Sequence, residues 1–332
     1  MLKVTAIQDA LQFGDGFSLT FQRTLRIPDD GNSYPLPPGL GAFPVRKVSD
    51  YRDRVPASWL EHGGVFMPMY QREAMWINFN SRHWKPNAVK VAVGKINAVS
   101  GEAWNQHLLA DKEDYLVCPP QPWLDGINAG DGYIRQFVAM PLGMGYTVEA
   151  QVTGEETFGG IQIIVYEPKP GRFPDEPPVV NTGALRSYAF AEAAMPMASL
   201  GAEMGLAAGG RMKQKIYPDP HGIDTWDENN YGRVYVHIVN SLAYREITHL
   251  EPPSTPVTAK TYSEYGLPWF DLYDEKTGDI KSPDAFKQIK SVKDMDKEKG
   301  FAPQQDDDTV NVPEDKIITY KIDKNEVEDG DW

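Results

Sequence analysis

A dense group of ionisable side chains lies between positions 219 and 228, within the stretch PDPHGIDTWDE. Carboxylate oxygens together with one imidazole nitrogen suit a divalent ion such as manganese, zinc, iron or calcium. One hypothesis is therefore a metal site, in which a divalent metal ion would be the cofactor. Its ligands would be Asp219, His221, Asp224 and Asp227.

The same stretch is also typical of a long polar turn. The acids do not follow the spacing of a calcium-binding loop, and no second histidine lies within four residues of His221. Asp, Asn, Gly and Pro are favoured in turns because their side chains bond locally to the backbone or preset its dihedral angles. The alternating run 232–240 then follows as a strand. We therefore favour a turn without a cofactor and keep the metal site as the alternative.

A second group of carboxylates, Glu149, Glu155 and Glu156, lies in the stretch GYTVEAQVTGEETFGG. Two carboxylates on neighbouring strands can cleave a glycosidic bond by acid/base chemistry. However, the alternation of residues 146–154 predicts a strand in which Glu149 faces water, and the other two glutamates would lie on a hairpin loop. The alternative catalytic residues are Glu149, His221 and Asp224.

Other catalytic signatures are weak or missing. Ser199 lacks the first glycine of a nucleophile elbow, and Cys118, the single cysteine, has no paired base in its surroundings. Several tryptophans could line a sugar-binding surface by stacking, although tryptophans near strand ends more often cover a core. They are Trp84, Trp104, Trp123, Trp226 and Trp269.

The composition is that of a globular protein with a large negative charge. Apolar residues make up 41% of the 332 residues, which is enough for a sizeable core. The formal net charge of −14 repels phosphate groups, so nucleic acid is a poor candidate partner. The sequence has neither an apolar run long enough to span a membrane nor a secretory leader pattern. We therefore expect no membrane span and a soluble protein of the cytoplasm.

Short segments rich in β-branched and aromatic residues recur between turn signals from residue 60 to residue 166. This spacing predicts a mainly β (β-rich α+β) fold, with an antiparallel sandwich or barrel-like core and a few short helices. Residues 1–26 add further alternating runs, and we expect a single domain over residues 1–295. The expected strands of the central region are 63–70, 73–79, 88–96, 115–118, 133–140, 146–154 and 160–168.

Extended segments flank this predicted core. Residues 28–45 are rich in proline and glycine, which favours an extended arm over a regular element. Residues 296–332 are expected to form an acidic linker and tail, because residues 301–332 hold ten acidic residues and three lysines. A strand predicted at 315–323 would pair with a sheet edge of its own chain or of a neighbour.

Residues 189–210 differ from the rest in being rich in Ala, Gly and Met. We expect two helical stretches there, broken near Pro196 and ending at Gly209-Gly210. Small residues allow close approach and methionine adapts to irregular partners, so the segment is a candidate self-association surface, a membrane-active strip or a buried helix. A further helix is predicted to begin at Ser282-Pro283-Asp284 and to extend through Val292.

Several stretches carry a resemblance to a family of bacterial and fungal proteins that has no assigned activity. They are LPPGLGAFPV, RQFVAMPLGMGYTVEAQ, GGRMKQKIYPDPHGIDTWD, VHIVNS and YSEYGLPWFDLYDE. The resemblance covers roughly residues 35–290 and implies that they form one coherent unit. It implies no catalytic residue.

The arms, the terminal strand and the Ala/Gly/Met segment all need partners, while catalytic signatures are missing. We therefore expect a non-enzymatic structural or binding protein that self-associates through its arms and terminal strand as a homo-oligomer. One alternative is a metal- or carboxylate-dependent hydrolase or carbohydrate-active enzyme. Another is a membrane-active protein that uses residues 189–210. Any small-molecule ligand stays unidentified.

Overall fold

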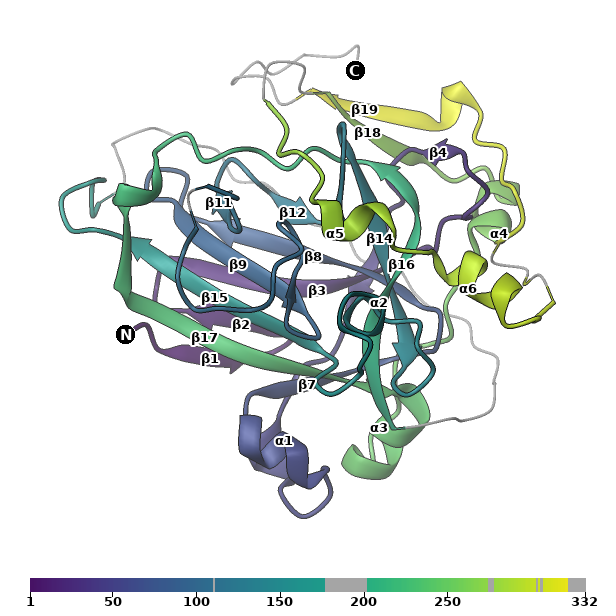
Figure 1. Ribbon diagram of the computed structural model, residues 1–332, viewed down its shortest axis with the longest axis horizontal. Coiled ribbons are helices and arrows are strands. Elements are labelled where there is room, and N and C mark those ends of the chain that lie inside the picture. The colour runs from purple at the N-terminus through teal and green to yellow at the C-terminus, as the bar shows by residue number, and fades with distance from the viewer. Residues whose placement is uncertain (110, 177–201, 274–277, 303, 305–306, 322–332) are drawn as a thin grey trace, which may run out of the picture.

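The computed structural model describes the chain apart from residues 110, 177–201, 274–277, 303, 305–306 and 322–332 (Figure 1). Strands hold 39% of the residues and helices 17%, and the strand pairing is mostly antiparallel. The predicted mainly β, sandwich-like fold with a few short helices is therefore confirmed. The alternative of a barrel-like core is wrong, because the described strands form no closed barrel.

The first layer is an antiparallel sheet in which β3 pairs with β2 on one side and with β8 on the other. Alternation along β3 buries Phe17, Leu19 and Phe21 and leaves the residues between them half-buried. This is the pattern of a sheet with one face on a core and one face toward solvent. The strands are β1 Val4–Ile7, β2 Ala10–Phe13, β3 Phe17–Thr24, β5 Gly39–Ala42, β8 Ala74–Ser81 and β12 Trp123–Leu124.

The second layer is built around β15, which pairs antiparallel with β9 and with β17. The next strand, β7, runs parallel to β17. Every residue of β9 is buried, because the loop after it folds back over its outer face. The strands are β6 Arg46–Lys47, β7 Val65–Met69, β9 Asn87–Val93, β10 Ile96–Asn97, β11 Leu116–Cys118, β15 Ile161–Pro168 and β17 Trp226–Asn240.

Two long strands connect the layers. β14 (Tyr133–Pro141) pairs with β8 of the first layer and with β16 (Glu203–Lys213). β16 in turn pairs with β17 of the second layer, where Met204 lies opposite Ile238. The remaining strands at this corner are β4 Ser33–Tyr34, which runs parallel to β16, and β13 Gly126–Gly130, which pairs with β14.

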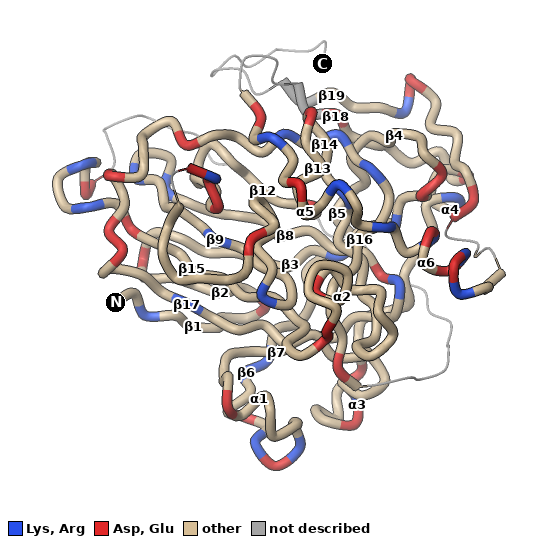
Figure 2. Tube along the Cα trace, in the orientation of Figure 1, with Lys and Arg blue, Asp and Glu red and all other residues tan. Residues whose placement is uncertain are grey.

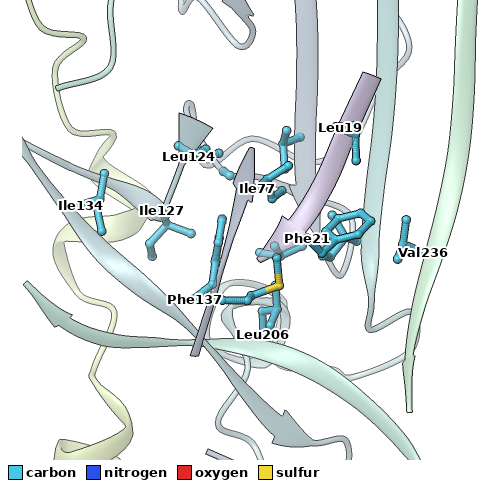
Figure 3. Close-up of a cluster of buried hydrophobic side chains, with 14 of the residues drawn as sticks. Leu19, Phe21, Ile77, Leu124, Ile127, Ile134, Phe137, Leu206 and Val236 are labelled. Atoms are coloured by element: carbon cyan, nitrogen blue, oxygen red, sulfur yellow. The ribbon is translucent and has the colours of Figure 1, made fainter. Parts of the chain in front are cut away.

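The main core lies between the two layers. Figure 3 shows one cluster of buried apolar side chains. It includes Phe21 and Ile77 of the first layer, Val236 of the second, and Phe137 and Leu206 of the connecting strands. All these side chains are at most 1% exposed, so the sandwich is closed by apolar packing of the kind that contributes most to stability.

The helices are short and lie at the edges of the sandwich (Figure 1). No helix of the described residues is long and apolar enough to cross a membrane. Charged residues gather in the loops and peripheral helices, among them α1, α4 and α6 (Figure 2). The helices are α1 Ala57–His62, α2 Val148–Thr153, α3 Ser241–Thr248, α4 Ala259–Glu264, α5 Asp284–Lys287 and α6 Val292–Glu298, with 3₁₀ turns η1 Val48–Tyr51, η2 Ile223–Thr225 and η4 Glu314–Lys316.

The predicted arm and terminal strand both pair within the chain. The arm over 28–45 contains β4 and β5, and Leu36 bridges to Phe270. The predicted terminal strand is present as β19 (Ile317–Lys321) and runs parallel to β18 (Trp269–Tyr273). Each of the two segments that were expected to pair with a second chain therefore pairs along one edge with a strand or residue of its own chain.

Two predicted elements are wrong. The strand predicted over residues 146–154 is replaced by the helix α2 (Val148–Thr153), because the Thr147 hydroxyl caps the helix by accepting the Ala150 amide hydrogen at 3.1 Å. Residues 203–210, expected to be helical, belong to strand β16. The rest of the Ala/Gly/Met segment, through residue 201, lies outside the described residues.

The C-terminal region also departs from expectation in two places. The single helix predicted from Ser282 is split into α5 and α6, because Ser291 and Asp294 form a capping box that starts a second helix. The stretch expected to be a solvated acidic linker contains Asp296 and Asp307, which are both 6% exposed. Asp307 contacts Arg26 at 2.8 Å and Arg72 at 3.3 Å, so these charges are paired in the interior.

Candidate functional site

Asp219 lies in the loop before β17, and its carboxylate is occupied by the protein itself. Oδ2 accepts hydrogen bonds from the Tyr115 hydroxyl at 2.8 Å and the Trp226 indole nitrogen at 2.9 Å. Oδ1 accepts the His221 amide hydrogen at 2.7 Å, which closes a local turn. These bonds tie the loop to a buried tyrosine and a buried tryptophan.

The other predicted ligands point to different partners. The exposed His221 ring packs edge-on against Phe173 and Trp226. Asp224 is exposed in η2, and Asp227 accepts the Asn229 amide hydrogen at 2.9 Å in a second turn. Nowhere in the described residues do three or more His, Cys, Asp or Glu side chains gather in a way that could hold a metal ion.

Glu149 is buried rather than facing water, so that prediction is wrong. It is 3% exposed in the first turn of α2. Its Oε1 accepts the backbone N–H groups of Thr157 and Phe158, and Oε2 accepts that of Gly159, each at 2.8 Å. A carboxylate saturated by three backbone donors fixes a loop and leaves little capacity for a substrate.

A cavity of about 540 Å³ lies next to the Asp219 loop, between residues 99–113 and residues 279–285. The backbone N–H of Asp219 donates to Glu113, which joins the loop to the cavity wall. Burial, with a further contribution from the nearby Asp219 charge, raises the pKa of Glu113. The acidic side chains of the lining are Glu102, Asp111, Glu113, Asp279 and Asp284.

The outer face of the first layer has a different character. Register places Gln22 opposite Trp76, Thr20 opposite Asn78 and Ser18 opposite Asn80. The neighbouring strands add Gln12 opposite Ser18 and Trp123 opposite Asn78. Each of these side chains is uncharged, and we call this surface the amide face: Gln12, Ser18, Thr20, Gln22, Trp76, Asn78, Asn80 and Trp123.

Two half-buried tryptophans stand at one side of the amide face. The Trp76 and Trp123 rings meet edge to face, with centroids 6.1 Å apart and planes at 68°. The indole nitrogen of Trp76 is buried and has no hydrogen-bond partner among the described residues.

The orientation of Trp123 is set from below by Asp125. Trp123 donates its indole hydrogen to Asp125 Oδ2 at 2.6 Å, and Gln214 donates to the same oxygen at 2.8 Å. Burial raises the pKa of Asp125 to about 7. A fixed ring costs less conformational entropy on binding than a mobile one, so this arrangement preorganises the face.

Sequence reasoning named Trp123 as a candidate for sugar stacking but missed Trp76. The signal was available, because alternation in EAMWINFN places Trp76, Asn78 and Asn80 on one side of a strand. Of the other predicted tryptophans, Trp226 and Trp269 are buried at 2% and 1% exposure, Trp104 packs against Lys90, and Trp84 lies beyond the end of β8 against Arg82. Comparison with known proteins adds nothing to this geometry, since no family model, curated protein or solved structure matches the chain.

Proposed function

We propose that this is a non-enzymatic binding protein whose amide face takes an uncharged carbohydrate chain. The observation that supports the proposal is the composition of that face. Two packed tryptophans stand beside a continuous set of amide and hydroxyl side chains, and Arg82 borders this set where it packs against Trp84.

The chemistry of these side chains matches a neutral sugar. The apolar C–H faces of a pyranose ring pack on indole rings, which combine a large apolar surface with a polar edge. Sugar hydroxyls both donate and accept hydrogen bonds, and so do the amides of Asn78, Asn80 and Gln22. A protein partner would instead be expected to meet a face with an apolar centre enriched in arginine.

Affinity electrophoresis in gels that contain neutral polysaccharides such as glucans, mannan or soluble chitin tests the proposal. We expect at least one of them to retard the wild-type protein. Trp76→Ala should weaken binding at least tenfold, because a lost contact of about 1.4 kcal/mol changes Kd tenfold. Asn78→Asp should also weaken it, because an unpaired charge on this face must be desolvated when the sugar binds.

Ala57→Asp is the matched control. It adds the same charge at an exposed position of α1, where an acid suits the start of a helix. Binding by this variant should equal that of the wild type. The proposal fails if no neutral polysaccharide retards the wild-type protein, or if Asn78→Asp and Ala57→Asp bind alike.

A hydrolase is the second candidate, and the cavity beside Glu113 is the observation that favours it. Burial keeps the Glu113 carboxyl protonated to a higher pH than usual, which suits a general acid. Asp219 lies beside it and takes part in the same hydrogen-bonded loop. Release of reducing sugar from the polysaccharides above, lost in Glu113→Gln, would support this candidate; binding without release supports the first.

Self-association and a cytoplasmic location stay predictions that are independent of the ligand. The arm and β19 are paired within the chain, so a homo-oligomer would need other surfaces than the paired edges. Light scattering over a wide concentration range tests the prediction, and a monomer throughout contradicts it.

A further inference from the structure

A lysine lies in the interior of the second layer. Lys90, in the middle of β9, is 0% exposed. It stands among aromatic side chains, with its ammonium group 5.7 Å from the centre of the Trp104 ring. Lysine is almost never fully buried unless it is paired, so this position requires specific partners. Burial lowers the pKa of Lys90, so the neutral amine is easier to form there than in water.

The partners of Lys90 all come from the loop that covers it. Its Nζ lies 2.7 Å from Oδ2 of Asp114 and donates to Oδ1 of Asn105 at 3.1 Å. It also donates to the carbonyl oxygen of His107. Asp114 is 1% exposed; its Oδ1 accepts the Leu109 amide hydrogen, and its Oδ2 is buried with no fully formed hydrogen bond in the described structure.

The side-chain amide of Asn105 is polarised by two donors. Its Oδ1 accepts hydrogen bonds from Lys90 Nζ and from the backbone N–H of His107, the latter at 3.0 Å. Donors aimed at a carbonyl oxygen stabilise the negative charge that develops there when a nucleophile adds to the carbon. An amine, a polarised carboxamide and a buried carboxyl group therefore meet at one point.

We propose that Lys90 and Asn105 join in an isopeptide bond within the chain, with Asp114 carrying the proton. The nucleophile and the amide belong to β9 and to the loop after β10, and they are 15 positions apart. The bond would fasten the covering loop to the second layer. It is independent of the carbohydrate proposal, since the amide face lies on the other layer.

The reaction balances without an added reagent. Lys90 first gives a proton to Asp114, which leaves a neutral amine beside a carboxylic acid. The amine nitrogen adds to Cγ of Asn105, and the carbonyl oxygen becomes an oxyanion held by His107 N–H. Asp114 then protonates the amide nitrogen and takes a proton from the attacking nitrogen. The C–N bond of the Asn105 amide breaks, and ammonia leaves. The ammonia takes up the proton that Asp114 removed from the attacking nitrogen, so Asp114 is again a carboxylate and the products are one secondary amide and one ammonium ion.

The mass of the purified full-length protein under denaturing conditions tests this directly. We expect a mass lower than that of the sequence by one ammonia. Trypsin should no longer cleave after Lys90, and tandem mass spectrometry should find a branched peptide that joins Lys90 to Asn105. A full mass together with normal cleavage after Lys90 overturns the proposal, and this result needs no variant that might fold poorly.

Loss of ammonia also accompanies ring closure of Asn105 onto its own backbone, so two variants separate the reactions. Lys90→Arg keeps a cation but cannot form the bond, and it should restore the full mass; a loss that persists in this variant overturns the proposal. Asp114→Asn, with a circular dichroism spectrum equal to that of the wild type, should also keep the full mass. Cross-linking in this variant would remove Asp114 from the mechanism and overturn its assigned role.

Discussion

The Trp123 indole nitrogen donates to a buried carboxyl oxygen of Asp125 at 2.6 Å, directly beneath the amide face. The same oxygen accepts from Gln214, and burial raises the Asp125 pKa to about 7. The residue that orients a ring of the proposed binding face therefore changes charge near neutral pH. The stability of the fold is consequently linked to one proton.

Asp125→Asn should flatten the dependence of stability on pH between about pH 4 and pH 7. In the unfolded chain the Asp125 carboxyl loses its proton near its usual pKa of 3.8, whereas in the fold it keeps the proton to about 7. The folded state then holds more protons, so stability falls as pH rises through this window, by up to about 1.4 kcal/mol per pH unit. Asparagine keeps an oxygen for Trp123 and Gln214 but does not ionise.

Urea unfolding of wild type and Asp125→Asn at a series of pH values gives the measurement. The unfolding free energy of the variant should rise relative to that of the wild type from pH 4 to pH 7. Above pH 7 the difference should stay constant. Asp131→Asn is the control, because Asp131 lies shortly after Asp125 in the chain but is exposed. The difference in unfolding free energy between this variant and wild type should not change with pH in this way. A constant difference for Asp125→Asn across the window contradicts the argument.

Glu149→Ala should destabilise the protein by about 3 kcal/mol or more, because it leaves three backbone N–H groups without their acceptor. Glu155→Ala, an exposed position a few residues later, should change stability by less than about 0.5 kcal/mol. Thermal and urea unfolding of both variants provide the comparison. Equal stabilities would show that the Glu149 bonds are not formed in solution.

The Glu149 result also shows where alternation misleads. Val148, Ala150 and Val152 alternate with polar residues as in a strand, yet the backbone turns helical. Thr147 caps the helix and Gly154 ends it, and these local signals outweigh the alternation; the contacts of Glu149 to residues 157–159 lie beyond it. An inside–outside alternation identifies strands such as β3 and β8, whereas β7, β9 and β15 are buried almost throughout and were predicted from their β-branched and aromatic residues between turn signals.

The strand β16 was missed for a related reason. Alanine and glycine suggested helices with a glycine stop, but the glycines serve close packing between strands. A β-carbon on Gly209 would lie 2.7 Å from Val138 Cγ2, and one on Gly205 would lie 2.8 Å from Thr147 Cγ2. Small residues are required there by neighbours that the sequence places far away. The amide face could be inferred strand by strand, but not the register that joins its strands.

Asp307→Ala should cost about 3–5 kcal/mol, because it removes a counter-charge of the buried Arg26 and one of the two carboxylates that the half-buried Arg72 contacts. Asp308 is the matched control, since it is the next residue and pairs with Lys260 at 3.2 Å on the surface. Asp308→Ala should cost less than about 1 kcal/mol. Chemical unfolding of the two variants tests the difference, and similar losses would place Asp307 in solvent.

His237 should make the protein sensitive to acid. Its ring stacks between Trp59 and Tyr235, with centroids 4.6 and 4.4 Å away, and burial lowers its pKa to about 4. The unfolded chain binds a proton at this histidine near its usual pKa of 6.5, whereas the folded chain stays neutral to about 4. The unfolded state then holds more protons, so stability decreases as pH falls from about 6.5 to 4.

His237→Phe keeps a ring in the stack and removes the titration, although it loses the bond from the histidine ring to the Gly63 carbonyl oxygen at 3.0 Å. We expect this variant to be less stable than wild type at pH 7 by about 1 kcal/mol. Below pH 6.5 the unfolding free energy of this variant should fall less steeply than that of the wild type. The difference in slope corresponds to one bound proton, which is about 1.4 kcal/mol per pH unit. His221→Phe changes an exposed histidine and is the control. It should leave the decrease of stability between pH 6.5 and pH 4 unchanged. Equal slopes of unfolding free energy against pH for wild type and His237→Phe would show that His237 is protonated as readily in the fold as in the unfolded chain.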